Sequence, residues 1–214
     1  MGPETGPGLW LVIGIMALSL VLALFVGFRA GLTRDRRGKM FASVGLFILP
    51  VLAVWLGFRE QMTRAESTRF CLSCHAMSDW GKSLYIDDPS VFPAVHFQNH
   101  LIPADHACYT CHTTYTFFGP LKSKIEGLRH MYVEYLGTIP PPAKIKLYTP
   151  YDNRECLYCH GGARDFLQVD KHNKPAGEMA KIMSNQVSCM AANCHDTIHA
   201  IEDLKDVTFW KRGK

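Results

Sequence analysis

Two long stretches of the chain contain no charged residue. Residues 9–28 and 40–58 are uncharged over twenty and nineteen consecutive positions. Each is long enough for a helix that crosses the hydrocarbon core of a bilayer, which is about 30 Å thick. A cleaved secretory signal is an alternative for the first stretch, but such a signal begins with basic residues. The positions before it carry only Glu4 as a charge. Because a soluble domain of this size rarely buries two such stretches, the sequence predicts a transmembrane helical hairpin.

Basic residues are absent before the first stretch and concentrated between the two. The loop at residues 29–39 contains four arginines and one lysine against the single acidic residue Asp35. Short loops rich in Lys and Arg stay in the cytoplasm. We therefore expect residues 1–60 to form a hairpin with two spans in the inner (cytoplasmic) membrane. The rest of the chain would then lie on the periplasmic or external side.

No cysteine stands alone. The eight cysteines form four pairs, and a histidine directly follows each pair. Motifs 1, 2 and 3 (residues 71–75, 108–112 and 156–160) have the form C-x-x-C-H, whereas motif 4 (residues 189–195) has four residues between its cysteines. The residues are Cys71, Cys74 and His75; Cys108, Cys111 and His112; Cys156, Cys159 and His160; and Cys189, Cys194 and His195.

C-x-x-C-H is the attachment signature of c-type haem, in which two thiols bond to the porphyrin and the histidine binds the iron. Cysteine pairs also build zinc sites and redox dithiols. Neither alternative requires a histidine directly after the second cysteine, and all four pairs have one. The longer loop of motif 4 can bulge and still present both sulfurs. The sequence therefore predicts four covalently bound haem c groups and leaves no thiol for a disulfide.

The haem motifs are dense along the chain. With about one motif per thirty residues, the polypeptide is too thin to enclose four porphyrins in an ordinary apolar core, so the haems must form most of the core. We expect a tetrahaem cytochrome c domain over residues 61–200 and a polar C-terminal tail over residues 201–214. Close spacing of redox centres indicates electron transfer.

Secondary structure is expected to be mainly α with irregular loops. Residues 138–150 are rich in proline, which stiffens the chain and separates motifs 1 and 2 from motifs 3 and 4. Residues 120–136 predict a helix, because Pro120 suits a first turn and Gly137 suits a helix end. No convincing strand pattern is present.

The positive charge of the chain is misleading. The formal net charge is +4, but five basic residues lie in the loop between the apolar stretches. Two propionates on each of four haems would give the outer part of the chain a net charge of roughly −7. Nucleic-acid binding therefore has no support.

The sequence offers more candidates for the second axial ligands than there are positions. Six histidines remain outside the motifs for at most four positions: His96, His100, His106, His130, His172 and His199. Among these, we take His96, His130 and His199 as distal candidates. Met77, two residues after His75, is placed to approach the first haem, and a thioether ligand raises the potential of a haem iron.

Three segments resemble the NapC/NirT/NrfH family of membrane-anchored multihaem cytochromes, over roughly residues 41–200. They are Cys71-x-x-Cys74-His75-x-Met77, His96-Phe-Gln-Asn99, and Lys122-Ser-Lys124-Ile-Glu-Gly127-Leu-Arg129-His130. The resemblance implies a protein that oxidises membrane quinol and supplies electrons to a periplasmic reductase. It also implies a methionine near the first iron, a distal ligand at His96, and a lysine and an acidic residue at the quinol site.

The chain departs from this family pattern in three places. It has two apolar stretches where one span is usual, a longer motif 4, and His130 where the acidic residue is expected. Lys122 and Lys124 lie on either side of the expected lysine position, so both are candidate residues of the quinol site. The expected substrate is a quinol such as menaquinol.

Two further classes of function stay open from the sequence. The first is an electron-transfer subunit that connects two proteins of a respiratory or photosynthetic complex without a quinol site of its own. The second is a reductase of small nitrogen or sulfur compounds. A reductase would need an open iron position, and the spare histidines argue against one.

Overall fold

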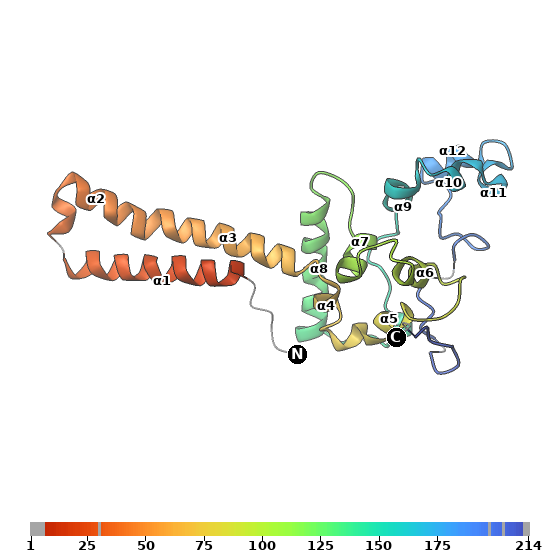
Figure 1. The fold of residues 1–214 in the computed structure, drawn as a ribbon, viewed down its shortest axis with the longest axis horizontal. Helices are drawn as coiled ribbons and strands as arrows, with labels where there is room; N and C mark the ends of the chain where they lie inside the picture. Colours follow the sequence, from red (N-terminus) through yellow and green to blue (C-terminus); the bar gives the residue numbers. More distant parts are fainter. Residues whose placement is uncertain (1–6, 30, 197, 203, 212–214) are drawn as a thin grey trace. The chain divides into compact units, whose positions relative to one another are not determined.

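The computed structural model describes residues 7–29, 31–196, 198–202 and 204–211 of the 214 in the chain. Helices joined by loops make up the described part, whose only β-type pairing is an isolated bridge between Ile86 and Phe209. The expected mainly helical fold class is confirmed. The chain divides into two units, residues 1–65 and 66–214, which are described separately (Figure 1).

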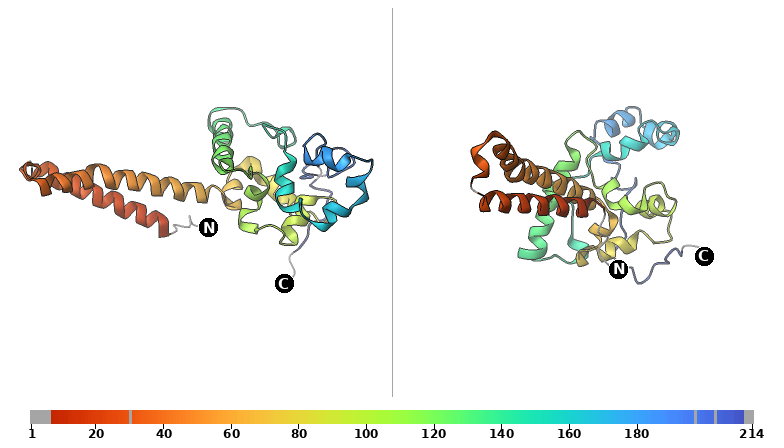
Figure 2. Two further views of the ribbon diagram at one scale, coloured as in Figure 1. Left: turned by 90° about the horizontal axis from the view of Figure 1, so that it is seen from above. Right: turned by 60° about the vertical axis from the view of Figure 1, so that its left-hand side comes forward.

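The first unit contains two long apolar helices that run side by side (Figures 1 and 2). Helix α1 spans Pro7–Phe28. The second stretch, Arg36–Arg64, is continuous and consists of α2 (Arg36–Ser43), a π-helical turn (Val44–Ile48) and α3 (Leu49–Arg64). Both are long and apolar enough to cross a membrane, and only 11% of the most apolar window of each is buried. That exposure is unlike a core helix of a soluble protein and suits a lipid-facing one.

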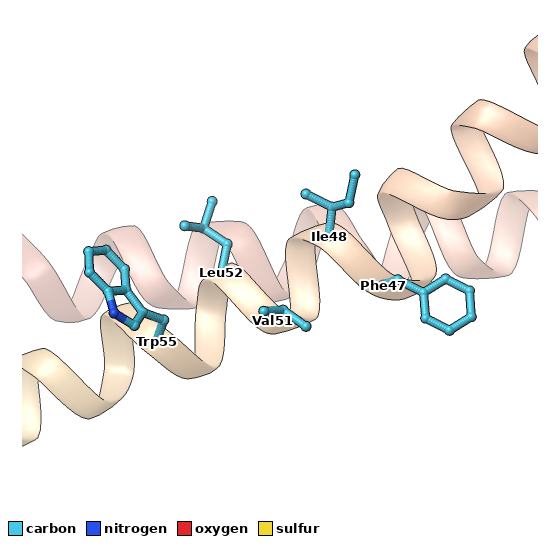
Figure 3. Close-up of a pocket in the computed structure, with 5 residues that line it drawn as sticks. All are labelled: Phe47, Ile48, Val51, Leu52 and Trp55. Atoms are coloured by element: carbon cyan, nitrogen blue, oxygen red, sulfur yellow. The ribbon is translucent and has the colours of Figure 1, made fainter.

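Helix α3 presents large apolar side chains on its surface. Together with Phe47 and Ile48 of the preceding π-helical turn, its residues Val51, Leu52 and Trp55 line a shallow, almost purely apolar depression (Figure 3). Side chains of this kind are stable in hydrocarbon, where no water competes for the surface. The surface of the hairpin therefore matches that of a membrane anchor.

A hydrogen bond between the two long helices compensates for Pro50. The Leu49 amide bonds to the Val44 carbonyl, and Pro50 has no N–H to offer the next carbonyl, that of Gly45. The Ser19 hydroxyl of α1 donates to this Gly45 carbonyl at 2.7 Å. A Cβ on Gly45 would lie only 2.8 Å from the Leu22 Cβ, so glycine permits the close approach of the helices.

The second unit consists of one long helix and several short ones, separated by loops. The helices are α4 (Thr68–Cys71), α5 (Ser78–Ser83), α6 (Phe92–Gln98), α7 (Ala107–Cys111), α8 (Gly119–Leu136), α9 (Asn153–His160), α10 (Arg164–Gln168), α11 (Asp170–Asn173) and α12 (Glu178–Met183). Helix α8 lies where residues 120–136 predict it.

The apolar core of this unit is small. Ile86, Val91 and Ala94 form a buried cluster, and Leu204 and Val207 from the end of the chain pack against it. A cluster of this size cannot stabilise about 150 residues by burial of apolar side chains alone. The fold therefore fits the expectation that bound cofactors supply much of the core.

Candidate haem-binding site

The four cysteine motifs lie next to one another in space. The Cys71 thiol of motif 1 is within hydrogen-bonding reach of Cys108 of motif 2. Cys156 of motif 3 stands in the same relation to Cys189 of motif 4. Motifs 2 and 3 are also neighbours, because the Tyr115 ring, just beyond motif 2, stacks on the Tyr158 ring of motif 3 with centres 4.0 Å apart. The motifs thus form a continuous series in chain order.

Polar side chains hold motifs 3 and 4 together. Asn153, at the start of α9, is 1% exposed, and its amide donates to the carbonyls of Ile182 and Val187 at 2.9 and 2.6 Å. Its oxygen accepts from the Cys189 amide at 2.8 Å. Because a buried amide is stable only when its hydrogen bonds are satisfied, Asn153 fixes the first cysteine of motif 4 relative to α9.

Three histidines of the motifs face a second histidine. The ring centres of His112 and His199 are 6.2 Å apart with an interplanar angle of 15°. The corresponding distances are 5.8 Å for His160 with His96 and 6.4 Å for His195 with His172. Metal–imidazole bonds are about 2 Å long and the ring centre lies about 1 Å beyond the nitrogen. Two imidazoles on one iron therefore have centres roughly 6 Å apart, and these pairs fit that spacing.

The second histidine of each pair is oriented through its Nδ1 atom. His96 Nδ1 lies 2.7 Å from the Phe92 carbonyl, and His172 Nδ1 lies 2.9 Å from the Phe166 carbonyl. A carbonyl only accepts hydrogen bonds, so Nδ1 carries the proton in both cases and Nε2 is left with a free lone pair. Both rings are therefore prepared to bind a metal through Nε2.

His199, the partner of His112, also carries its proton on Nδ1, and here a serine hydroxyl accepts the hydrogen bond. Ser83 is fully buried, and its Oγ lies 2.7 Å from His199 Nδ1. The Ser83 hydroxyl donates its single proton to the Trp80 carbonyl at 2.7 Å. Its oxygen then accepts from Nδ1–H of His199. Burial lowers the pKa of His199 to about 4, so this imidazole is neutral at pH 7, as a metal ligand must be.

The structure distinguishes among the histidines that the sequence offered as distal ligands. His96 and His199 lie beside motif histidines, whereas the His130 ring packs on Tyr148 at 5.0 Å. His172, which sequence reasoning did not favour, occupies the position beside His195. Met77 ends the 3₁₀ turn that begins at His75, so the two potential ligands of the first iron share one turn.

Helix α8 brings charged groups to the haem motifs. Lys124 Nζ lies 4.3 Å from the ring centre of Tyr109, and burial lowers its pKa, opposed by the negative charges of Glu66 and Cys71. Burial raises the pKa of Cys74, and the Glu134 carboxylate of α8 raises it further. Lys122 instead is exposed and pairs with Glu126 at 3.8 Å. Lys124 therefore lies beside motif 2, over the Tyr109 ring.

Fold and motifs together define a class: a c-type cytochrome with several haem attachment sites and a membrane anchor. Residues 34–203 match the NapC/NirT cytochrome c family, N-terminal region. The chain belongs to this family, whose members carry covalently bound haem c and transfer electrons at membranes.

Several known cytochromes are similar to the chain at low sequence identity. The chain is 23% identical to cytochrome c-type protein NapC of Escherichia coli (strain K12) over 170 residues, which are 73% of this chain and 80% of the relative. It is 24% identical to the denitrification system component NirT of Stutzerimonas stutzeri, over 76% of this chain and 84% of the relative. A putative tetraheme cytochrome-c type protein of Allochromatium vinosum is 26% identical, over 63% and 73%. No solved structure matches the chain.

Proposed function

We propose that this protein is a tetrahaem cytochrome that takes electrons from membrane quinol and passes them to a periplasmic or membrane-associated oxidoreductase. The observation that carries the proposal is the continuous series of four motifs, with Lys124 of α8 beside motif 2. Family membership supports electron transfer at a membrane.

We assign the ligands of the four haems as follows. The eight motif cysteines would form the thioether bonds, and His75, His112, His160 and His195 would hold the iron atoms on one side. Met77, His199, His96 and His172 would be the second ligands, in the same order, so that His172 replaces His130 in the set expected from the sequence. When bound, the haems would supply one-electron redox chemistry, and two imidazole ligands at the haems of motifs 2, 3 and 4 would favour electron transfer over substrate binding.

Quinol would be oxidised near the start of α8. The apolar stripe of this helix is exposed, from 41% at Leu121 to 77% at Leu136. Exposed apolar side chains of this kind would accommodate the isoprenoid tail of a quinol. Lys124 would donate a hydrogen bond to a quinol oxygen and stabilise negative charge as protons leave.

The proposed topology follows from the charges of the hairpin. Both helices cross the inner membrane, the basic loop at residues 29–39 is cytoplasmic, and the haem unit is periplasmic. The boundaries expected from the sequence, at residues 60 and 200, remain proposals.

Reduction by a quinol tests this function directly. The purified, haem-loaded protein is mixed with menadiol under anaerobic conditions, and the haem α-band is followed. We expect reduction, with dithionite giving the full amplitude. A protein that dithionite reduces and menadiol leaves oxidised would instead be a subunit that receives electrons from another protein.

A further inference from the structure

Exposed apolar side chains gather on α8 and the segments beside it. More than half of the exposed large apolar side chains described in the second unit fall within residues 117–148, although this segment is far shorter than half of the unit. Those on α8 itself are Leu121, Ile125, Leu128, Met131, Tyr132, Tyr135 and Leu136. Their spacing of three and four residues places them on one face of the helix. An exposed apolar stripe of this size marks a surface that meets another molecule or a membrane.

The charged residues of α8 are sorted by sign around this apolar stripe. At 3.6 residues per turn, Lys122, Lys124 and Arg129 project within about 100° of the centre of the stripe, on both of its flanks. Glu126 and Glu134 project about 140° from that centre, on the side turned away from it. Lys122 pairs with Glu126 at 3.8 Å, but an exposed pair of this kind contributes little. The stripe is therefore bordered by positive charge.

The loop after α8 adds two lysines near one of these flanks. The Tyr148 ring lies against the helix, with its centre 4.1 Å from the Arg129 Cζ atom and 5.0 Å from the His130 ring centre. Residues 144–147, directly before Tyr148, alternate lysine with an apolar residue, and both lysines are exposed. Because Tyr148 holds the end of this segment against α8, the two lysines extend the positive border beside Arg129.

The positive charge of the second unit is confined to this region. Residues 113–150 contain five basic and two acidic residues, whereas the rest of residues 66–214 contains eleven basic and fourteen acidic ones. Haem propionates would make the remainder more negative still. A negatively charged surface would therefore attract the region around α8 and repel the rest of the unit, which selects one orientation.

We propose that α8 and residues 144–148 form a membrane-binding surface that inserts its apolar stripe into a bilayer of anionic phospholipids. Lys122, Arg129 and the two loop lysines would bind lipid phosphate groups, and the tyrosines would lie at the level of the headgroups. A second copy of the chain is a poorer occupant, because a two-fold contact through the stripe would bring the positive flanks together. The proposal does not depend on the quinol function.

Hydrogen–deuterium exchange of the full-length, haem-loaded protein tests this surface. The protein is placed in nanodiscs of phosphatidylcholine, with or without added phosphatidylglycerol. We expect residues 117–136 and 144–148 to exchange more slowly when phosphatidylglycerol is present. This difference should disappear at about 1 M salt, where the screening length falls to about 3 Å.

Two variants test the parts of the surface separately. Each basic residue contributes about fivefold to binding at an anionic surface. The double variant Lys144→Gln, Lys146→Gln should therefore lose a factor of about 25 and with it most of the difference between the two lipid compositions. Leu128→Gln changes a side chain that is 61% exposed, so the fold should tolerate it, and slow exchange of the stripe should be lost.

A matched control removes the same charge elsewhere. Lys171→Gln with Lys174→Gln alters two lysines outside the proposed surface and should exchange like the wild type. Haem content and the dithionite-reduced spectrum should be unchanged in every variant.

Three results would overturn the proposal. The first is equal exchange of α8 in the two lipid compositions. The second is an equal effect of the Lys144/Lys146 and Lys171/Lys174 variants. The third is protection of the stripe that appears in detergent without phospholipid and increases with protein concentration, since a second copy of the chain would then cover it.

Discussion

Replacement of Ser83 by alanine should change the potential of one haem and leave the others unaltered. The Ser83 oxygen accepts a hydrogen bond from Nδ1–H of His199, the proposed second ligand of the motif 2 haem. Such a bond makes an imidazole a better electron donor to its metal. A better donor favours the oxidised iron, so loss of the bond should raise the potential.

The size of the shift follows from the bond that is lost. A buried neutral hydrogen bond contributes about 0.5–1.5 kcal/mol. An energy of 1.4 kcal/mol corresponds to 59 mV for one electron. The potential of the haem should therefore rise by at most about 60 mV. If only a third of the hydrogen-bond energy differs between the oxidised and reduced haem, the rise is about 20 mV. The exposed surface does not change, because Ser83 is fully buried.

The assay is a spectroelectrochemical titration of the haem-loaded protein, combined with electron paramagnetic resonance of the oxidised state. The His112 and His199 rings are 15° from parallel, whereas the other two pairs are at 78° and 56°. Near-parallel and near-perpendicular imidazoles give different low-spin signals, which identifies the haem that shifts. Ser83→Thr should restore the potential. Unchanged potentials and signals in Ser83→Ala would refute the assignment of His199 and its orientation by Ser83.

Three further predictions concern the cofactors and the membrane. His172→Ala should convert one haem to the high-spin state, whereas His130→Ala should leave all spectra unchanged; the reverse result would restore His130 as the ligand. The denatured protein should retain the mass of four haems, and a mass of three would argue against attachment at motif 4. Protease added outside spheroplasts should remove the haem unit and spare residues 29–39, and cleavage of that loop from outside would contradict the proposed topology.

Local patterns in the sequence predicted the local features of this fold. The uncharged stretches gave the two long helices, and Pro120 and Gly137 gave the bounds of α8 to within one residue. Such features depend on hydropathy and on backbone geometry over a few neighbouring positions. The attachment motifs are of the same kind, since their chemistry is contained in five to seven consecutive residues.

Features that depend on contacts between distant residues were not predictable. His172 and His130 are equivalent in sequence, and only the folding of α10 and α11 toward motif 4 distinguishes them. Ser83 is 116 positions from His199, and no local signal marks it as a partner.

The hairpin illustrates the same limit. Pro50 indicates a disturbed helix and a carbonyl without its usual donor. The sequence did not identify Ser19 as the donor, because the register between the two helices is set by their packing.

The central claim, that quinol delivers electrons to this haem series near Lys124, is tested most directly by the rate of haem reduction in lipid nanodiscs. Wild type, Lys124→Leu and the matched control Lys122→Leu are mixed with menadiol in a stopped-flow instrument. The account predicts rapid reduction of the wild type and of Lys122→Leu, and reduction slowed by about 100-fold in Lys124→Leu, with equal amplitudes under dithionite. Equal rates for all three proteins, or a wild type that menadiol fails to reduce, would contradict it.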